Sequence, residues 1–485
     1  PPQKHSTNSL LPPIDTAMHL EIGESVSGLL ADGVEDTPWV GATIRLDGRR
    51  GLVVEVPYLQ GADGGQFDHV MRWFASQEAP PNMWLLTPEG SLSLFDIVWM
   101  GRRHSFVDRK ASIGTLRPSV VVFGSREGSF GDPLVIDEMY SWIDGLNGWS
   151  NLTAVSIDPS LDERNVPNQL LVTVKSEPAF EWVQGDAGMR IQSTWSEASE
   201  SDGYQRKVLI CDDVSLISSF SSGPKCFDDH YREQQKVRHF MTFMYGRQLF
   251  FRRHALRDDR FSLVINDRGD RIWPRTELVS SRTCVEYIRD VPSRDKLKDP
   301  LASLQTVGVG GMEAWAASYE DWERFILPSV NVLGRDGVFA EDVILSTSMS
   351  MEAAGELIGE CDGEASLKGR GRNLPVSLCI YRCLHVLELE LPSEFGGITV
   401  LSKSIASTYN SIKHSSRGDF PDGREVRVVC DLNKLVVRLL ALYVAKVDLN
   451  SSIRSDILVG FEKIAANMSY WSVSVSEDGK WCYGD

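Results

Sequence analysis

The spacing of apolar residues changes near residue 300, and this change most constrains the fold. Between about residue 38 and residue 215, short runs of β-branched and aromatic residues end at Gly, Pro, Asp or Asn, as antiparallel strands do. After residue 311 the apolar residues recur every three or four positions, which is typical of packed helices. The sequence therefore predicts an α+β chain, in which a mostly antiparallel, sandwich- or barrel-like N-terminal domain precedes a C-terminal all-α bundle.

A charged, proline-bounded segment, residues 291–300, separates the two patterns. We predict a polar lead over residues 1–20, a β-rich domain over 21–300, a helical domain over 311–450 and an extension over 451–485. Gly308–Gly311 is interpreted as linker, because no strand–turn–helix pattern with a Lys surrounds it to make a phosphate loop. The predicted helices are Phe227–Tyr245, Tyr319–Leu327 ending at Pro328, Ala340–Glu360, Leu374–Leu391, Ile398–His414, Leu432–Val447 capped by Asp431, and Ile453–Met468.

Composition limits the classes of function. The 485 residues carry a net charge of −17, which argues against a protein that coats duplex DNA but leaves room for a local basic pocket. The eight cysteines show no C-x-x-C and no zinc-type spacing, so we expect reduced thiols in a cytoplasmic protein without a metal. The first residues lack the apolar core of a secretory signal. The longest apolar run, residues 435–447, is too short to span a membrane.

Polar residues gather at the end of the predicted helix Ile398–His414. Asn410 and His414 are four positions apart, so they share one helix face. Histidine is the side chain whose unperturbed pKa lets it take and give protons near neutral pH. With Lys413 and Arg417 beside it, this face suits a phosphate-rich substrate. The alternative is a structural helix end, where solvated cations favour the helix dipole.

Other basic segments favour structural roles. Arg232 with His239 and Arg247 with His254 both fit Arg-x6-His, but such matches arise by chance among nine histidines and many arginines. The run from residue 252 to residue 260 is the densest basic patch. Contact with RNA and a solvated hairpin are both compatible with it, and the hairpin is the simpler interpretation.

Several segments together carry a resemblance to a known family. They are Tyr409-Asn-Ser-Ile-Lys-His414, the Arg417-Gly-Asp-Phe-Pro-Asp422 that follows, Met349-Ser-Met-Glu352, the strands Gly41–Leu46 and Ser91–Val98, and the aromatic region after Ile136. In these the chain resembles the ApeA-type proteins of the HEPN superfamily. The resemblance implies a β-rich N-terminal domain, a helical HEPN domain that dimerises, and defence against phage through damage to host RNA.

The HEPN resemblance also implies a chemistry. Many members are metal-independent endoribonucleases whose signature is Arg, four to six residues, then His, often with Asn after the Arg. In this chain the Arg position that lies four intervening residues before His414 is Tyr409, which carries no permanent charge. We therefore predict His414, Asn410 and Tyr409 as the catalytic set, without cofactor or metal. The predicted RNA- or phosphate-binding cations are Lys413, Arg417 and Arg372.

Three functions stay open. The first is an antiviral, abortive-infection endoribonuclease whose β-rich domain senses a trigger. The second, favoured by the tyrosine at 409, is a catalytically inactive HEPN sensor or scaffold that dimerises or binds RNA. The third is a carbohydrate- or protein-binding β-sandwich with a helical appendage. The expected partners are RNA, a second copy of the chain bound through the HEPN domain and a phage protein as trigger, with no membrane.

Overall fold

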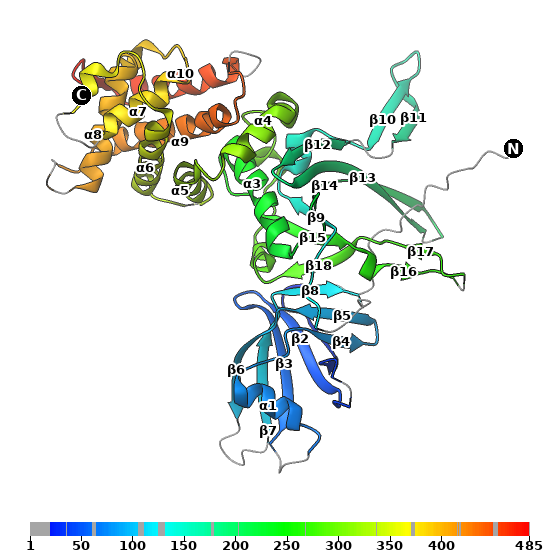
Figure 1. Ribbon diagram of the computed structural model, residues 1–485. Coiled ribbons are helices and arrows are strands. Elements are labelled where there is room, and N and C mark those ends of the chain that lie inside the picture. The colour runs from blue at the N-terminus through cyan, green and yellow to red at the C-terminus, as the bar shows by residue number, and fades with distance from the viewer. Residues whose placement is uncertain are drawn as a thin grey trace.

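The computed structural model describes residues 20–34, 36–60, 65–104, 111–124, 131–175, 179–201, 203–266, 268–335, 337–369, 374–414, 416, 419–449 and 454–484. A large antiparallel sheet occupies the N-terminal half, and helices gather at the other end of the molecule (Figure 1). The predicted α+β class is thus confirmed. The division into domains at the stated boundaries stays a prediction.

Fourteen of the described strands form one sheet, in the order β12-β13-β14-β9-β15-β18-β8-β5-β4-β1-β2-β3-β7-β6. Every pairing within this order is antiparallel. The strands of the N-terminal part are β1 (Ser25–Ala31), β2 (Val40–Asp47), β3 (Gly51–Leu59), β4 (Met83–Thr87), β5 (Gly90–Phe95), β6 (Val98–His104), β7 (Ala111–Arg117) and β8 (Val120–Phe123). The others are β9 (Glu138–Ile143), β12 (Ala179–Gln184), β13 (Ala187–Ser201), β14 (Arg206–Phe220), β15 (Phe251–Arg257) and β18 (Thr276–Ser280).

Three further strand pairs stand outside this sheet. They are β10 (Val155–Leu161) with β11 (Pro167–Val174), β16 (Leu263–Val264) with β17 (Arg271–Ile272), and β19 (Val473–Val475) with β20 (Trp481–Tyr483). The pair β10–β11 projects from the body of the molecule (Figure 1). The last pair lies in the C-terminal extension, after α10 (Arg454–Tyr470).

The strands β1–β8 enclose a core of their own. Alternating residues such as Ile44, Leu46, Val54 and Val56 are buried there, as period-two burial requires. Helix α1 (Asp68–Ser76) lays Phe74 against this core, and the ring stacks on Tyr58 with centroids 5.5 Å apart. Strand β18 then joins this part to the rest, because it pairs with β8 on one side and β15 on the other.

The helical half contains α4 (Leu304–Ser318), α5 (Glu323–Leu333), α6 (Ala340–Ile358), α7 (Val376–His385), α8 (Ile398–Lys413), α9 (Gly423–Val444) and α10 (Arg454–Tyr470). Besides α1, the helices α2 (Leu146–Ser150) and α3 (Phe227–Tyr245) precede it. One apolar core runs from β9 through α3 to α10, so the second half of the sheet and the helices share buried surface. Trp149 and Trp315 lie fully buried in that core.

The bounds of three helices differ most from the predictions. Helix α7 spans Val376–His385 and not Leu374–Leu391, and in α5 and α9 tertiary packing outweighs a local signal. Helix α5 begins later than expected and continues through Pro328, burying Phe325 and Val332 on either side of it. Helix α9 begins at Gly423 with the Asp422 carboxylate accepting the Arg424 backbone N–H at 2.8 Å, so Asp431 lies inside the helix instead of capping it.

The segment Gly308–Gly311 belongs to α4 and is not a linker. Gly308 kinks this helix with φ 68° and ψ 173°, a conformation that favours glycine. Gly311 packs so closely that an added Cβ would lie 2.7 Å from Val307 Cγ1 and 3.4 Å from the Ala445 carbonyl oxygen. Gly311 therefore permits the contact between α4 and the end of α9, and Gly308 permits the kink.

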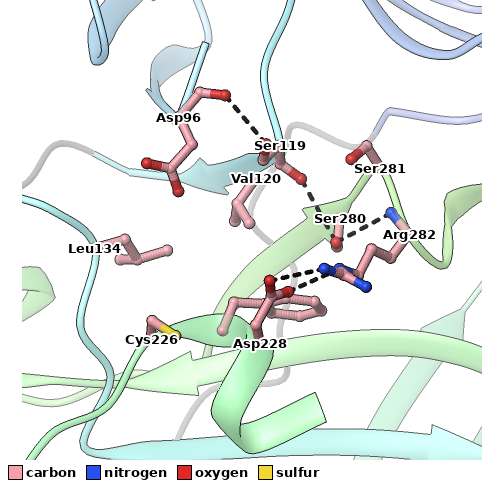
Figure 2. A pocket seen from close by; sticks show the side chains of 10 residues that line it. Asp96, Ser119, Val120, Leu134, Cys226, Asp228, Ser280, Ser281 and Arg282 are labelled. Carbon is pink, nitrogen blue, oxygen red and sulfur yellow. Dashed lines mark hydrogen bonds and ion pairs between the residues drawn. The ribbon is translucent and has the colours of Figure 1, made fainter. Parts of the chain in front are cut away.

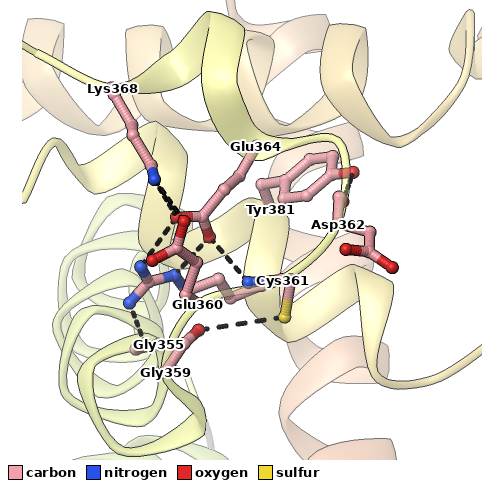
Figure 3. Close-up of polar contacts among 9 residues, drawn as sticks. Gly355, Gly359, Glu360, Cys361, Asp362, Glu364, Lys368 and Tyr381 are labelled. Carbon is pink, nitrogen blue, oxygen red and sulfur yellow. Dashed lines mark hydrogen bonds and ion pairs between the residues drawn. The ribbon is translucent and has the colours of Figure 1, made fainter.

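A buried ion pair fixes the short 3-10 helix η4 (Glu364–Leu367) to α6 and α7 (Figure 3). Arg382 of α7 donates from Nε to Glu364 Oε2 at 2.7 Å and from Nη2 to Oε1 at 2.9 Å. Its Nη1 donates to the Gly355 carbonyl of α6 at 3.1 Å. The Arg382 hydrogen bonds hold the pKa of Glu364 down at about 2.

Candidate functional site

The C-terminal end of α8 carries the residues that the sequence singled out. Leu401, Ile405 and Tyr409 recur at spacings of four and are fully buried, so this stripe of α8 packs into the helical core. The helix ends at Lys413, and His414 follows in an extended conformation with φ −127° and ψ 104°. The His414 backbone N–H still donates to the Asn410 carbonyl at 2.9 Å, which closes the last turn.

Tyr409 fixes the position of Lys413. The ring of Tyr409 is inaccessible to solvent, and its hydroxyl accepts a hydrogen bond from Lys413 Nζ at 2.7 Å. The same ammonium lies 4.9 Å from the centre of the ring, within range of a cation–π contact. A cation is therefore held at a defined place on the last turn of α8, directly before the histidine.

Asn410, Lys413 and His414 lie within five consecutive positions at this helix end, with His414 directly after the last helical residue. The side chains of Asn410 and His414 are half-buried, so both reach solvent at the helix end. An imidazole, an amide and an ammonium in one turn supply a proton carrier, a hydrogen-bonding group and a positive charge. Of the other predicted phosphate-binding residues, Arg372 and Arg417 lie outside the described residues.

A hydrogen-bond network behind this turn was not anticipated from the sequence. Glu425 of α9 accepts hydrogen bonds from Thr408 Oγ1, at 2.6 Å, and from the Tyr483 hydroxyl. Trp481 Nε1 donates to Thr408 Oγ1 at 2.9 Å. Burial raises the pKa of Glu425. The pair β19–β20 thus pins α8 one residue before Tyr409, and the sequence signal for it was no more than a Trp- and Tyr-bearing end.

The basic run of β15 has a structural role. Arg252 pairs with Asp144 at 2.7 Å, and Arg253 stacks over Trp142 with 3.9 Å between the guanidinium carbon and the ring centre. Strand β15 lies inside the sheet between β9 and β18, so the simpler expectation of a solvated hairpin was wrong. The local signal misled because Arg252 and Arg253 find their partners in β9 and directly after it, more than 100 positions earlier in the chain.

The two chance Arg-x6-His matches place their histidines in the interior. Desolvation lowers the pKa of His239 to about 3 and that of His254 to about 3, so both are neutral at physiological pH. His239 Nδ1 is 2.6 Å from the Tyr319 hydroxyl, and His254 Nδ1 is 2.6 Å from Ser141 Oγ. Buried and hydrogen-bonded in this way, these rings have no access to a substrate.

A pocket of about 300 Å³ opens where β5, β8 and β18 meet the start of α3 (Figure 2). All the residues that line it precede α8 in the sequence. Arg282 and Asp228 form an ion pair on its wall, with Nε 2.8 Å from Oδ1. Desolvation raises the pKa of the neighbouring Asp96 carboxyl, and the negative charge of Asp228 adds to the effect. No sequence motif pointed to this pocket.

Two broader features bear on the class of protein. Within the part of the chain that the structure describes, no group of three or more His, Cys, Asp or Glu is placed to hold a metal ion. No described helix is both long enough and apolar enough to cross a bilayer.

The fold and the α8 turn together define an α+β protein in which a sheet-rich N-terminal half is joined to a helical half with a cationic, histidine-bearing helix end. Residues 36–263, a little less than half of the chain, match the family described as ApeA N-terminal domain 1, so this part of the chain is similar to that domain. No curated protein and no solved structure matches it. Because the matched range ends before α4, the assignment of the helices to HEPN stays a prediction.

Proposed function

We propose that this chain is an ApeA-type phage-defence protein whose helical half is a HEPN domain that cleaves RNA without a metal. The observation that carries the proposal is the hydrogen bond from Lys413 Nζ to the Tyr409 hydroxyl at 2.7 Å, beside His414. It supplies a fixed positive charge at the place where the HEPN signature has its arginine. Lys413 thereby supplies the positive charge that the arginine of the signature would otherwise supply.

The proposed reaction uses the substrate's own hydroxyl as nucleophile. The ribose 2′-oxygen forms a bond to the adjacent phosphorus as the bond from phosphorus to the 5′-oxygen breaks, leaving a cyclic phosphate and a free 5′-hydroxyl. His414 of one copy takes the 2′ proton, and a second protonated group, His414 of a partner copy in the HEPN arrangement, donates one to the leaving oxygen. Lys413 stabilises the charge on the phosphoryl oxygens, and Asn410 orients the phosphate or the ring.

The second candidate, an inactive HEPN scaffold, also has an observation in its favour. The side chain at position 409 is fully buried. A charged arginine there would have to leave water, so the signature arginine does not fit this packing without rearrangement. A chain that has exchanged this arginine for a core tyrosine can retain dimerisation or RNA binding after losing cleavage.

Cleavage of purified RNA in excess EDTA separates the two candidates. We expect His414→Ala to reduce the rate roughly 100-fold or more, as loss of a general acid–base group does. Lys413→Met is expected to have an effect of similar order, since a charge stabiliser is lost. Lys403→Met, on the same helix and half-buried, is the matched control and should cleave at the wild-type rate.

Plating of a panel of phages on cells that express each variant gives a second readout. The nuclease proposal expects protection to fail with His414→Ala and to persist with Lys403→Met. If purified wild type cleaves no RNA and His414→Ala still protects, the scaffold is the better description. Equal cleavage by wild type and His414→Ala would refute the site assignment itself.

Variants at position 409 test the role of the tyrosine. Tyr409→Phe keeps the buried ring but removes the hydroxyl that holds Lys413, so we expect slower cleavage by an otherwise unchanged fold. Tyr409→Arg restores the signature. A gain of toxicity would indicate a decayed nuclease, whereas loss of existing activity would assign the tyrosine a part in the native mechanism.

A further inference from the structure

The projecting hairpin β10–β11 has one face made of apolar side chains alone. In the antiparallel register Val155 lies opposite Val174, Ile157 opposite Val172 and Pro159 opposite Leu170. Directly opposed residues share a face of the sheet, so these six side chains form one continuous stripe. Four of them are exposed to solvent: Pro159, Ile157 at 59%, Leu170 at 62% and Val172 at 36%. A contiguous apolar patch that is exposed to solvent is typical of a binding site for another molecule.

The hairpin is anchored at its base and free along its length. Asp212 of β14 accepts hydrogen bonds from Thr153 Oγ1 at 2.5 Å and from the Ala154 backbone N–H at 3.2 Å. Beyond that point β10 and β11 pair with each other and with no other strand among the described residues. An isolated two-stranded ribbon is marginally stable in water, and its outer edges offer unpaired backbone groups. A third strand would satisfy both needs.

The two edges are not equivalent. Proline is confined within sheets to edge strands or bulges, because it cannot donate to the ladder, and Pro159 stands in the middle of β10. Strand β11 has its proline at the first position, Pro167, and its register shifts at Asn168, but from Gln169 to Val174 it runs without a proline or a further shift. The edge of β11 is therefore the one that can accept a complete strand.

The opposite face of the hairpin sets the charge of the partner. Leu171, 54% exposed, lies there opposite Asp158. The hairpin from residue 155 to residue 174 contains Asp158, Asp162 and Glu163 but a single basic residue, Arg164. A second copy of the chain, with its net charge of −17, is the wrong partner for this surface. Lysine or arginine side chains can lay their aliphatic stems across Leu171 and extend their charges toward Asp158.

We propose that β11 is a docking edge for an extended segment of another protein, in which apolar residues alternate with lysine or arginine. The segment adds as a third strand, with its apolar side chains on the Ile157–Leu170–Val172 stripe and its basic side chains on the face of Leu171 and Asp158. Main-chain hydrogen bonds supply affinity, and the alternation supplies specificity. The docking edge goes beyond the proposed RNA chemistry and does not depend on it.

The test is selection from a displayed library of random decapeptides on the immobilised full chain. The counter-target is the triple variant Ile157→Thr, Leu170→Thr and Val172→Thr, which keeps β-branched residues suited to strands while removing the apolar stripe. The matched control carries Leu263→Thr and Val264→Thr on the β16–β17 pair, where the exposed fractions are 54% and 55%. Enriched peptides are expected to alternate apolar and basic residues, to bind the control as they bind wild type, and to bind the triple variant at least tenfold more weakly.

Hydrogen exchange locates the bound peptide. A selected peptide is expected to slow exchange of backbone amides within residues 168–174 at least tenfold. Enrichment of acidic or non-alternating peptides, equal binding to the triple variant, or protection confined to another part of the chain would each overturn the proposal. It also fails if no peptide is enriched, or if light scattering shows a wild-type dimer that the triple variant loses, which would make a second copy the occupant.

Discussion

Replacement of Glu364 by glutamine tests the physical account of the helical half most directly. The carboxylate is 2% exposed and receives two hydrogen bonds from Arg382, at 2.7 and 2.9 Å. Its pKa of about 2 compares with an ordinary value of 4.5. At about 1.4 kcal/mol for each tenfold change in proton affinity, this difference corresponds to about 3 kcal/mol of folding free energy at neutral pH. Removal of one partner from a buried pair costs a similar amount, roughly 3–5 kcal/mol.

The pH dependence gives this prediction its sign. The folded pKa of Glu364 lies below its unfolded value, so the stabilisation is complete above about pH 4.5 and disappears as the pH falls toward 2. The Glu364→Gln chain has no carboxylate to protonate at this position. The difference in stability between wild type and variant should therefore be largest at pH 7 and shrink steadily below pH 4.5.

Hydrogen exchange of the α7 backbone amides is the appropriate assay, because a chain with several cores need not unfold in one step. A loss of about 3 kcal/mol accelerates exchange through local opening about 100-fold. Lys368→Met is the control: Lys368 reaches the same carboxylate at 3.5 Å from the solvent side, with its own side chain 47% exposed, and exposed pairs contribute little. Wild-type exchange rates in Glu364→Gln at pH 7, or equal losses in both variants, would refute the reasoning.

Three further outcomes follow from the packing and titration of buried groups. Gly355→Ala should destabilise the α6–α7 contact by about 1–3 kcal/mol, because the new Cβ would lie 2.4 Å from Cys379 Cα, while Gly310→Ala, with nothing within 4 Å, should leave the thermal midpoint unchanged or slightly raised. Burial lowers the pKa of His230 to about 4 and those of His239 and His254 to about 3, so below about pH 6.5 the unfolded state binds protons that the folded state does not bind. The free energy of unfolding, measured by acid titration at constant urea, should therefore fall as the pH is lowered through this range. A flat profile from pH 6.5 to 4 would contradict the prediction. Burial raises the pKa of Cys379 to about 12, so a thiol reagent at pH 8 should reach this thiol only after denaturation. In the native chain the reagent should first modify the exposed cysteines Cys211, Cys226 and Cys482, which mass spectrometry can check.

The helices were predictable where local spacing and capping agree with tertiary packing. Helix α3 has the predicted bounds, Phe227–Tyr245, because an amphipathic stripe ends at Gly246, whose φ of 64° closes the helix. Helix α5 failed this rule at Pro328, where packing of the flanking residues offsets a missing hydrogen bond. Periodicity therefore identified the elements, and contacts with distant parts of the chain decided several of their ends.

The candidate site was predictable as a set of residues but not as an arrangement. The spacing of four drew attention to Asn410 and His414, yet spacing does not say which side of α8 faces the core or that Tyr409 lies there. Burial of the tyrosine, which turns it into an anchor for the ammonium, follows from packing across the helical half. Trp481 and Tyr483 reach the same turn from the end of the chain, a contact that no local pattern encodes.

The place of β18 in the sheet has a consequence for synthesis and for fragments of this protein. Strand β8 ends at Phe123, but its outer neighbour is not made until Ser280 has left the ribosome, so for more than half of translation the N-terminal sheet has an open side. A fragment cut at residue 263, where the family match ends, would keep that side open permanently and would expose β15 as well. Pieces of this protein intended for separate expression should therefore extend past Ser280, and shorter ones are expected to aggregate through these two bare strands.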